Sequence, residues 1–167
     1  MIRAVVLPNL ALLCRYRDAG AYTDGYSTDL DFAVSQAEFI EAFYCTWVFR
    51  LERWVLAVIV SKPSSDAQAR DLATGTSDSF AAWTVEGRTA DQLLLSDIGG
   101  RTRSWLMSQA YASGTRLYFG SAVVPLRDNS GRAPPSLIFG ALLAFHRLYS
   151  RLLLRAAVQR LRHRSAA

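Results

Sequence analysis

Few side chains in this sequence combine a reactive type with a spacing that would support catalysis or metal binding. The two histidines, His146 and His163, form no closely spaced pair, and the two cysteines, Cys14 and Cys45, form no C-x-x-C motif. Structural zinc sites need such ligands close together. The sequence also lacks a G-x-S-x-G motif, a glycine-rich phosphate loop and a zinc-peptidase signature. It therefore predicts no metal and no cofactor, and two reduced, buried thiols in a cytoplasmic protein.

Arg103 is the charged residue whose predicted surroundings most need a partner. A two-residue turn at Gly99-Gly100 places Arg103 beside Trp105 on an aromatic sheet face. Glu86 and Asp97 point away from that face in this register. The guanidinium then binds the anionic head of a ligand, or it extends its stem to reach water. Both alternatives remain open at this stage.

The first half of the chain predicts one strand and three helices. The strand is expected over 22–31, and a capping box at Ser35 and Glu38 opens the first helix. One face of this helix carries three rings spaced by four residues, Phe39, Phe43 and Trp47. A second helix is expected over 49–60 and a short third helix over 66–72.

From Phe80 onward the apolar pattern changes to a two-residue period, which predicts an antiparallel meander. Its strands are expected over 81–88, 92–98, 101–111 and 115–126, with turns at 89–90, Gly99-Gly100 and Ser113-Gly114. The turns pair Leu94 with Trp105 and Met107 with Gly120. One face of the sheet carries both of its tryptophans, and we expect the long helix to cover this face. The residues on this face are Trp83, Val85, Leu94, Arg103, Trp105, Met107, Tyr118 and Val124. A bulge in one strand would reverse part of this assignment.

A proline break at 133–135 precedes a helix predicted over 136–162. The solvent-facing side of this helix carries Arg147, Arg151 and Arg155. Residues 127–167 hold eight arginines and one acidic residue, in a chain whose net charge is +5. Such a basic end suits a solvated helix face, an anionic membrane surface or nucleic acid. We favour the solvated face and expect no nucleic-acid partner, with peripheral membrane contact as an alternative.

Length and composition favour one globular domain, because 167 residues with 51% hydrophobic side chains can bury a sizeable core. We expect residues 1–20 to form a loosely held N-terminal arm and residues 21–164 to form the domain. Pro8 and Asn9 interrupt the early apolar stretch, and no apolar run reaches the ~18 to 20 residues that cross a bilayer. The sequence therefore predicts a soluble protein without an integral membrane segment.

The order of elements resembles that of the helix-grip superfamily, which includes lipid-transfer (START-like, SRPBCC-like) and polyketide-cyclase-like folds. The segments Phe80–Glu86, Leu93–Leu95 with its Asp97, and Phe145–Arg151 look like those of an uncharacterised bacterial family of this superfamily. The resemblance covers roughly residues 21–162. It implies an α+β fold in which an antiparallel sheet, here of about five strands, wraps on a long C-terminal helix.

Helix-grip proteins bind hydrophobic or amphipathic small molecules between the sheet and the long helix, so the resemblance implies a pocket there. The residues expected to line it are Trp83, Trp105, Met107, Tyr118, Phe145 and Tyr149, with Arg103 at the ligand head. The alternative is that these side chains only fill a core.

We favour ligand binding without chemistry over catalysis. One alternative is a cyclase- or dehydratase-like enzyme that uses Asp97, Tyr118 or His146 as acid or base. The other is a protein that binds a membrane surface or a partner through its basic C-terminal helix.

Overall fold

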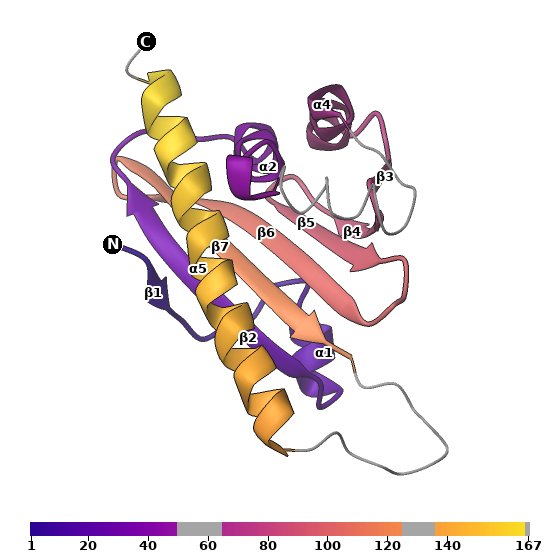
Figure 1. The fold of residues 1–167 in the computed structure, drawn as a ribbon. Helices are drawn as coiled ribbons and strands as arrows, with labels where there is room; N and C mark the ends of the chain where they lie inside the picture. The colour runs from indigo at the N-terminus through magenta and orange to yellow at the C-terminus, as the bar shows by residue number, and fades with distance from the viewer. Residues whose placement is uncertain (50–64, 125–135, 166–167) are drawn as a thin grey trace.

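The computed structural model describes residues 1–49, 65–124 and 136–165, with the backbone alone for 136–146. Apart from Phe49, the helix predicted over 49–60 lies outside the described residues. The proline break and the last two residues of the strand expected over 115–126 also lie outside them. The α+β class is confirmed, because one antiparallel sheet is combined with helices, the longest of which is C-terminal (Figure 1).

Within the described ranges, the sheet has seven strands in the order β1-β2-β7-β6-β5-β4-β3. Their bounds are Arg3–Ala4 (β1), Tyr22–Leu30 (β2), Ser79–Phe80 (β3), Trp83–Arg88 (β4), Gln92–Asp97 (β5), Thr102–Tyr111 (β6) and Gly114–Val123 (β7). The predicted meander corresponds to β4–β7 and is confirmed. The sheet exceeds the five expected strands because the two-residue strands β1 and β3 extend its edges.

The helices with described bounds are α1 (Cys14–Asp18), α2 (Gln36–Tyr44), α4 (Asp66–Thr74) and α5 (Ser136–Ser165). The predicted capping box is present at the start of α2, where the Glu38 amide donates to the Ser35 hydroxyl at 3.2 Å and the Ser35 amide donates to the Glu38 carboxylate at 2.8 Å. This local signal needs no tertiary contact, which explains why the sequence located the helix start correctly. A second capping box, at Ser65, opens α4.

Helices α2, α4 and α5 cover one face of the sheet and form the larger core with it. The core residues that the sheet contributes include Leu93, Leu95, Leu106, Leu117 and Phe119. Figure 1 shows α5 running across this face of the sheet. The N-terminal arm covers the opposite face, where Leu7 and Leu13 pack against Leu94 and Trp105 in a second core. The arm is thus packed rather than loosely held, and Leu13 is completely buried.

Most of the residues that we assigned to the helix-covered face of the sheet lie on the other face. The residues that pack under the arm instead are Leu94, Trp105, Met107 and Tyr118. Trp83 and Val85 do lie on the helix-covered face. A bulge in β4 separates the two groups, because Val85 pairs with Leu95 whereas Gly87 pairs with Leu94. Glu86 is the extra residue, and side chains beyond it exchange faces.

The register of the meander is confirmed at the Gly99-Gly100 turn and differs at the next turn. Leu94 pairs with Trp105 as predicted, but Gly120 pairs with Trp105 and not with Met107. Tyr111 pairs with Gly114, so the turn residues are 112–113. A β-carbon at Gly120 would lie 3.0 Å from the Trp105 ring. The glycine therefore makes room for Trp105, and not for Met107 as the predicted register implied.

Candidate functional site

A cavity of about 200 Å³ lies between α5, the helix-covered face of the sheet and the end of α2. Its apolar and aromatic lining residues are Phe43, Phe49, Trp83, Phe119, Tyr149 and Leu153. Its other lining residues are Thr102, Arg103, Ser104, Ser121 and Ser150.

The helical spacing of α5 and the cross-strand pairing of β6 with β7 bring these side chains together. Tyr149, Ser150 and Leu153 are spaced so that one side of α5 presents them to the sheet. On the sheet, Ser104 and Ser121 are direct cross-strand partners of β6 and β7. The floor of the cavity therefore has a polar stripe, whereas most of its wall is made of rings.

The polar groups of the floor already have partners within the protein. The hydroxyls of Tyr44 and Ser104 are 3.1 Å apart, and the Ser121 hydroxyl donates to Asp24 Oδ1 at 2.5 Å. Tyr26 is not among the described lining residues, but its hydroxyl donates to the same Asp24 carboxylate at 3.4 Å. Burial, reinforced by the Asp24 charge, raises the pKa of Tyr26 to about 12.

Two buried polar atoms in the cavity lining have no hydrogen-bond partner in the described part of the chain. They are Nε1 of Trp83 and Oγ of Ser150. Ser150 is completely buried, and Trp83 is half-buried with its ring nitrogen shielded. An unpaired polar atom in such a place costs stability. Both atoms are shielded from the space of the cavity, so they are groups of the surrounding core.

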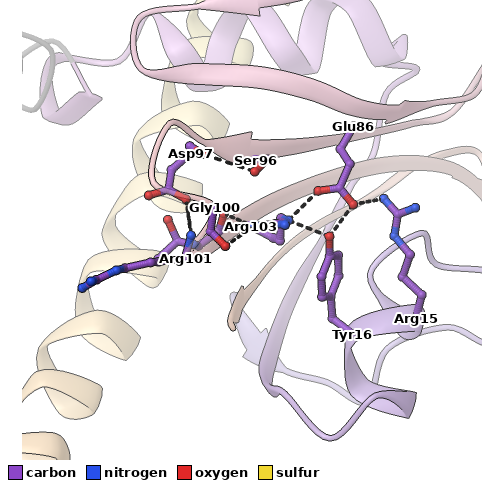
Figure 2. A network of polar contacts seen from close by, with 9 residues as sticks. Arg15, Tyr16, Glu86, Ser96, Asp97, Gly100, Arg101 and Arg103 are labelled. Carbon is purple, nitrogen blue, oxygen red and sulfur yellow. Dashed lines mark hydrogen bonds and ion pairs between the residues drawn. The ribbon is translucent and has the colours of Figure 1, made fainter. Parts of the chain in front are cut away.

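The Arg103 guanidinium does not point to the cavity, although the residue borders it. Its Nε lies 2.5 Å from Glu86 Oε2 and donates to the Tyr16 hydroxyl at 2.7 Å, under the N-terminal arm (Figure 2). The expectation that Glu86 points away from Arg103 is wrong, because the β4 bulge turns Glu86 toward the arm. Burial and the hydrogen bond to Glu86 raise the pKa of Tyr16.

The seven residues predicted to bind a ligand are divided between different places. Trp83 and Tyr149 line the cavity. Those that pack in the core under the arm, on the other face, are Trp105, Met107 and Tyr118. Arg103 reaches that same face with its guanidinium, and the side chain of Phe145 lies outside the described residues.

Sequence reasoning missed Phe119 and Ser150 as lining residues. A signal for Phe119 was present, because the face that we expected the long helix to cover leaves out this large apolar ring. For Ser150 the signal was weaker, being one small polar residue on the apolar side of a helix.

The residues considered for catalysis do not meet in the cavity. Asp97 accepts hydrogen bonds from the amides of Arg101 at 2.7 Å and Thr102 at 2.9 Å, which closes the β5–β6 turn. Tyr118 lies under the arm, and the side chain of His146 is outside the described residues. Across residues 1–49, 65–124 and 136–165, no three His, Cys, Asp or Glu side chains gather as a metal site.

The basic face of α5 is exposed, as predicted for Arg147, Arg151 and Arg155. Leu148 and Leu152 lie beside these arginines with 59% and 44% of their surface exposed. Arg147 also donates to the Tyr22 hydroxyl at 3.2 Å. Among the described helices, none combines the length and the apolar composition needed to cross a membrane.

Comparisons with known proteins give little further guidance. No protein-family model matches the chain. No curated protein matches it either. The crystal structure of CalU16 from Micromonospora echinospora aligns with 99% of this chain and 94% of its own, at 15% identity and a TM-score of 0.35. A similarity this low supports no argument about function, so the site rests on the geometry of this chain alone.

Proposed function

We propose that this domain binds a compact, mainly apolar small molecule between its sheet and α5, without changing it chemically. The observation that carries the proposal is the cavity of about 200 Å³ with its wall of aromatic and aliphatic side chains. An apolar cavity of roughly 150 Å³ is sufficient to hold benzene. Pockets for drug-sized ligands measure roughly 300 to 1,000 Å³. The volume here therefore suits a molecule of one or two rings.

Binding without chemistry is supported by the state of the polar groups near the cavity. The Ser104 and Ser121 hydroxyls are engaged with Tyr44 and Asp24. Catalysis by acid and base requires titratable groups aimed at one reacting atom. The resemblance to helix-grip proteins leads to the same proposal from the sequence.

Titration with ethylbenzene, followed by NMR of the ¹⁵N-labelled protein, tests the proposal. We expect saturable shifts at the amides of Phe119, Ser121 and Leu153. Leu153→Phe replaces an aliphatic side chain of the lining with a bulkier aromatic ring, which fills part of the cavity and should weaken binding at least tenfold. Leu148→Phe is the matched control, because it adds the same ring on the exposed side of α5. Absence of saturable binding, or equal affinity in the Leu153→Phe protein, would contradict the proposal.

A second candidate function is peripheral contact with an anionic membrane. It is favoured by the exposure of Leu148 and Leu152 beside the arginine side of α5. Each arginine near an anionic bilayer contributes about 1 kcal/mol, and salt screens this attraction. Sedimentation with phosphatidylserine vesicles should be lost at high salt and in an Arg151→Gln, Arg155→Gln protein. Retention in both cases would rule this function out.

A further inference from the structure

We infer that docking of the N-terminal arm, residues 1–20, strengthens ligand binding in the cavity, and that Arg103 is the positioning residue that transmits this effect. The inference rests on the proposed function, because it concerns how affinity in the same cavity is regulated. None of the arm's residues is among the described lining residues, so the arm acts on the cavity through the sheet.

Strand β6 is shared between the arm and the cavity. Thr102 and Ser104 line the cavity, whereas the Arg103 guanidinium and the Trp105 ring lie under the arm. Successive side chains of a strand point to opposite faces, so one stretch of backbone carries both sets of contacts. A contact that fixes Arg103 therefore also fixes the backbone on either side of it, from which Thr102 and Ser104 reach the cavity.

The arm holds the Arg103 guanidinium from one side. Arg103 Nε donates to the Tyr16 hydroxyl at 2.7 Å and lies 2.5 Å from Glu86 Oε2, and the Tyr16 hydroxyl in turn donates to Glu86. The guanidinium carbon lies 4.7 Å from the centre of the Tyr16 ring, within the range of a cation–π contact. The position of the guanidinium thus depends on Tyr16, which belongs to the arm.

The same guanidinium holds the turn before β6 from the other side. Arg103 Nη1 donates to the carbonyl oxygens of Gly100 at 3.0 Å and Thr102 at 3.2 Å. Figure 2 shows Arg103 between Gly100 and the pair formed by Tyr16 and Glu86. The guanidinium is a rigid planar fork, so a displacement at one end moves the donors at the other end. A chain of contacts therefore leads from Tyr16 through Arg103 to Thr102 at the cavity.

Coupling between two sites is reciprocal, so each site changes the binding free energy of the other by the same amount. A docked arm should raise ligand affinity, and a bound ligand should favour the docked arm by the same factor. The Leu12 amide reports on docking, because it donates to Gln92 Oε1 of β5 at 2.9 Å and this bond requires the arm in place.

Ethylbenzene titrations of the wild type and of Tyr16→Phe test the first direction. Tyr16→Phe keeps the ring and removes the hydroxyl that is bonded to Arg103 and Glu86. We expect affinity to fall by at least about threefold, as substitutions along such contact chains do. Tyr118→Phe is the matched control, because it removes a tyrosine hydroxyl from the same sheet face. The described partner of that hydroxyl is Gln109, 3.3 Å away and near the other end of β6, so affinity should stay within about twofold of the wild type.

Amide hydrogen exchange of the wild type tests the reverse direction. Saturating ethylbenzene should slow exchange of the Leu12 amide by at least about threefold. A ligand without coupling to the arm would leave exchange through local undocking unchanged. This readout therefore separates coupling from a purely structural role of Arg103, and it needs no variant to fold.

The outcomes distinguish this inference from the proposed function. Affinity of Tyr16→Phe within twofold of the wild type, or Leu12 exchange that ethylbenzene does not slow, would overturn the inference and leave ligand binding in the cavity standing. An equal loss of affinity in Tyr118→Phe would overturn the role of Arg103. If ethylbenzene does not bind the wild type, the proposed function fails and the inference fails with it.

Discussion

The Arg103 guanidinium lies 2.5 Å from a carboxylate oxygen of Glu86, on the sheet face that the N-terminal arm covers. Their side chains are 12% and 24% exposed, so water screens the pair only partly. Tyr16 of α1 joins both residues by hydrogen bonds, and Arg15 also pairs with Glu86 (Figure 2). A group that the sequence suggested as a ligand-binding residue thus fastens the arm to the sheet.

We therefore expect Glu86→Gln to destabilise the protein by about 1 to 3 kcal/mol, the usual range for losing hydrogen bonds to a charged group. Amide hydrogen exchange in α1 should become faster, because Tyr16 loses part of its attachment. Urea unfolding and exchange measurements check this expectation. Arg17→Gln is the control, since Arg17 pairs only with its exposed neighbour Asp18 in the described contacts and should change stability by less than about 0.5 kcal/mol. Equal small effects in both variants would contradict the role of Glu86.

Trp105→Ala should cost on the order of 3 to 5 kcal/mol, because it empties the core under the arm. The ring is completely buried against Gly120 and the arm, and its loss also leaves Gln92 Oε1 without the indole donor. The shift of the urea midpoint measures this loss. Trp47→Ala removes an equally large ring that is 71% exposed and should have a far smaller effect. A loss below about 1 kcal/mol for Trp105→Ala would mean that the arm does not enclose this ring.

Ser150→Ala should raise the free energy of unfolding of the ligand-free protein by about 1 kcal/mol. The substitution removes a buried hydroxyl without a described partner and adds a better helix former. Ser104→Ala provides the matched comparison, because the Ser104 hydroxyl is bonded to Tyr44 and its removal should lower stability by about the same amount. Thermal and urea unfolding measure both changes. A loss of stability in Ser150→Ala would show that its hydroxyl is already satisfied.

Asp29→Asn should destabilise the protein at neutral pH but not in strong acid. Arg116 donates to both carboxylate oxygens of Asp29, at 2.5 and 3.0 Å, and these bonds hold the pKa of Asp29 below its ordinary value. The ionised pair therefore stabilises the fold above the unfolded-state pKa of about 3.9, and this contribution is lost as the pH falls through the lowered folded-state pKa.

Urea midpoints measured from pH 7 to pH 2 test this pH dependence. The stability difference between wild type and Asp29→Asn should be constant near neutrality, shrink below about pH 4 and disappear in strong acid. Asp31→Asn, at an exposed site just after β2, is the control. A difference between wild type and Asp29→Asn that does not change with pH would show that the ion pair is not its source.

Much of the fold could be predicted from the sequence, because the signals are local. The capping box at Ser35 marks a helix start through its own hydrogen bonds. The two-residue period and the Gly99-Gly100 turn set the β5–β6 pairing, which the structure confirms. For the candidate site, the same reasoning identified Trp83 and Tyr149, whereas Ser150 was missed because a single serine in a helix has no distinctive pattern.

Only the tertiary structure decided which sheet face meets α5 and what Arg103 binds. Alternation sorts side chains into two faces but does not say which face a helix covers, and here the arm supplies a second core over Trp105. The bulge at Glu86 is also invisible in the alternation, yet it turns that carboxylate toward Arg103. One extra residue in a strand reverses every side chain beyond it. Where that residue falls depends on packing over the whole sheet, so the sequence pattern of β4 alone could not locate it.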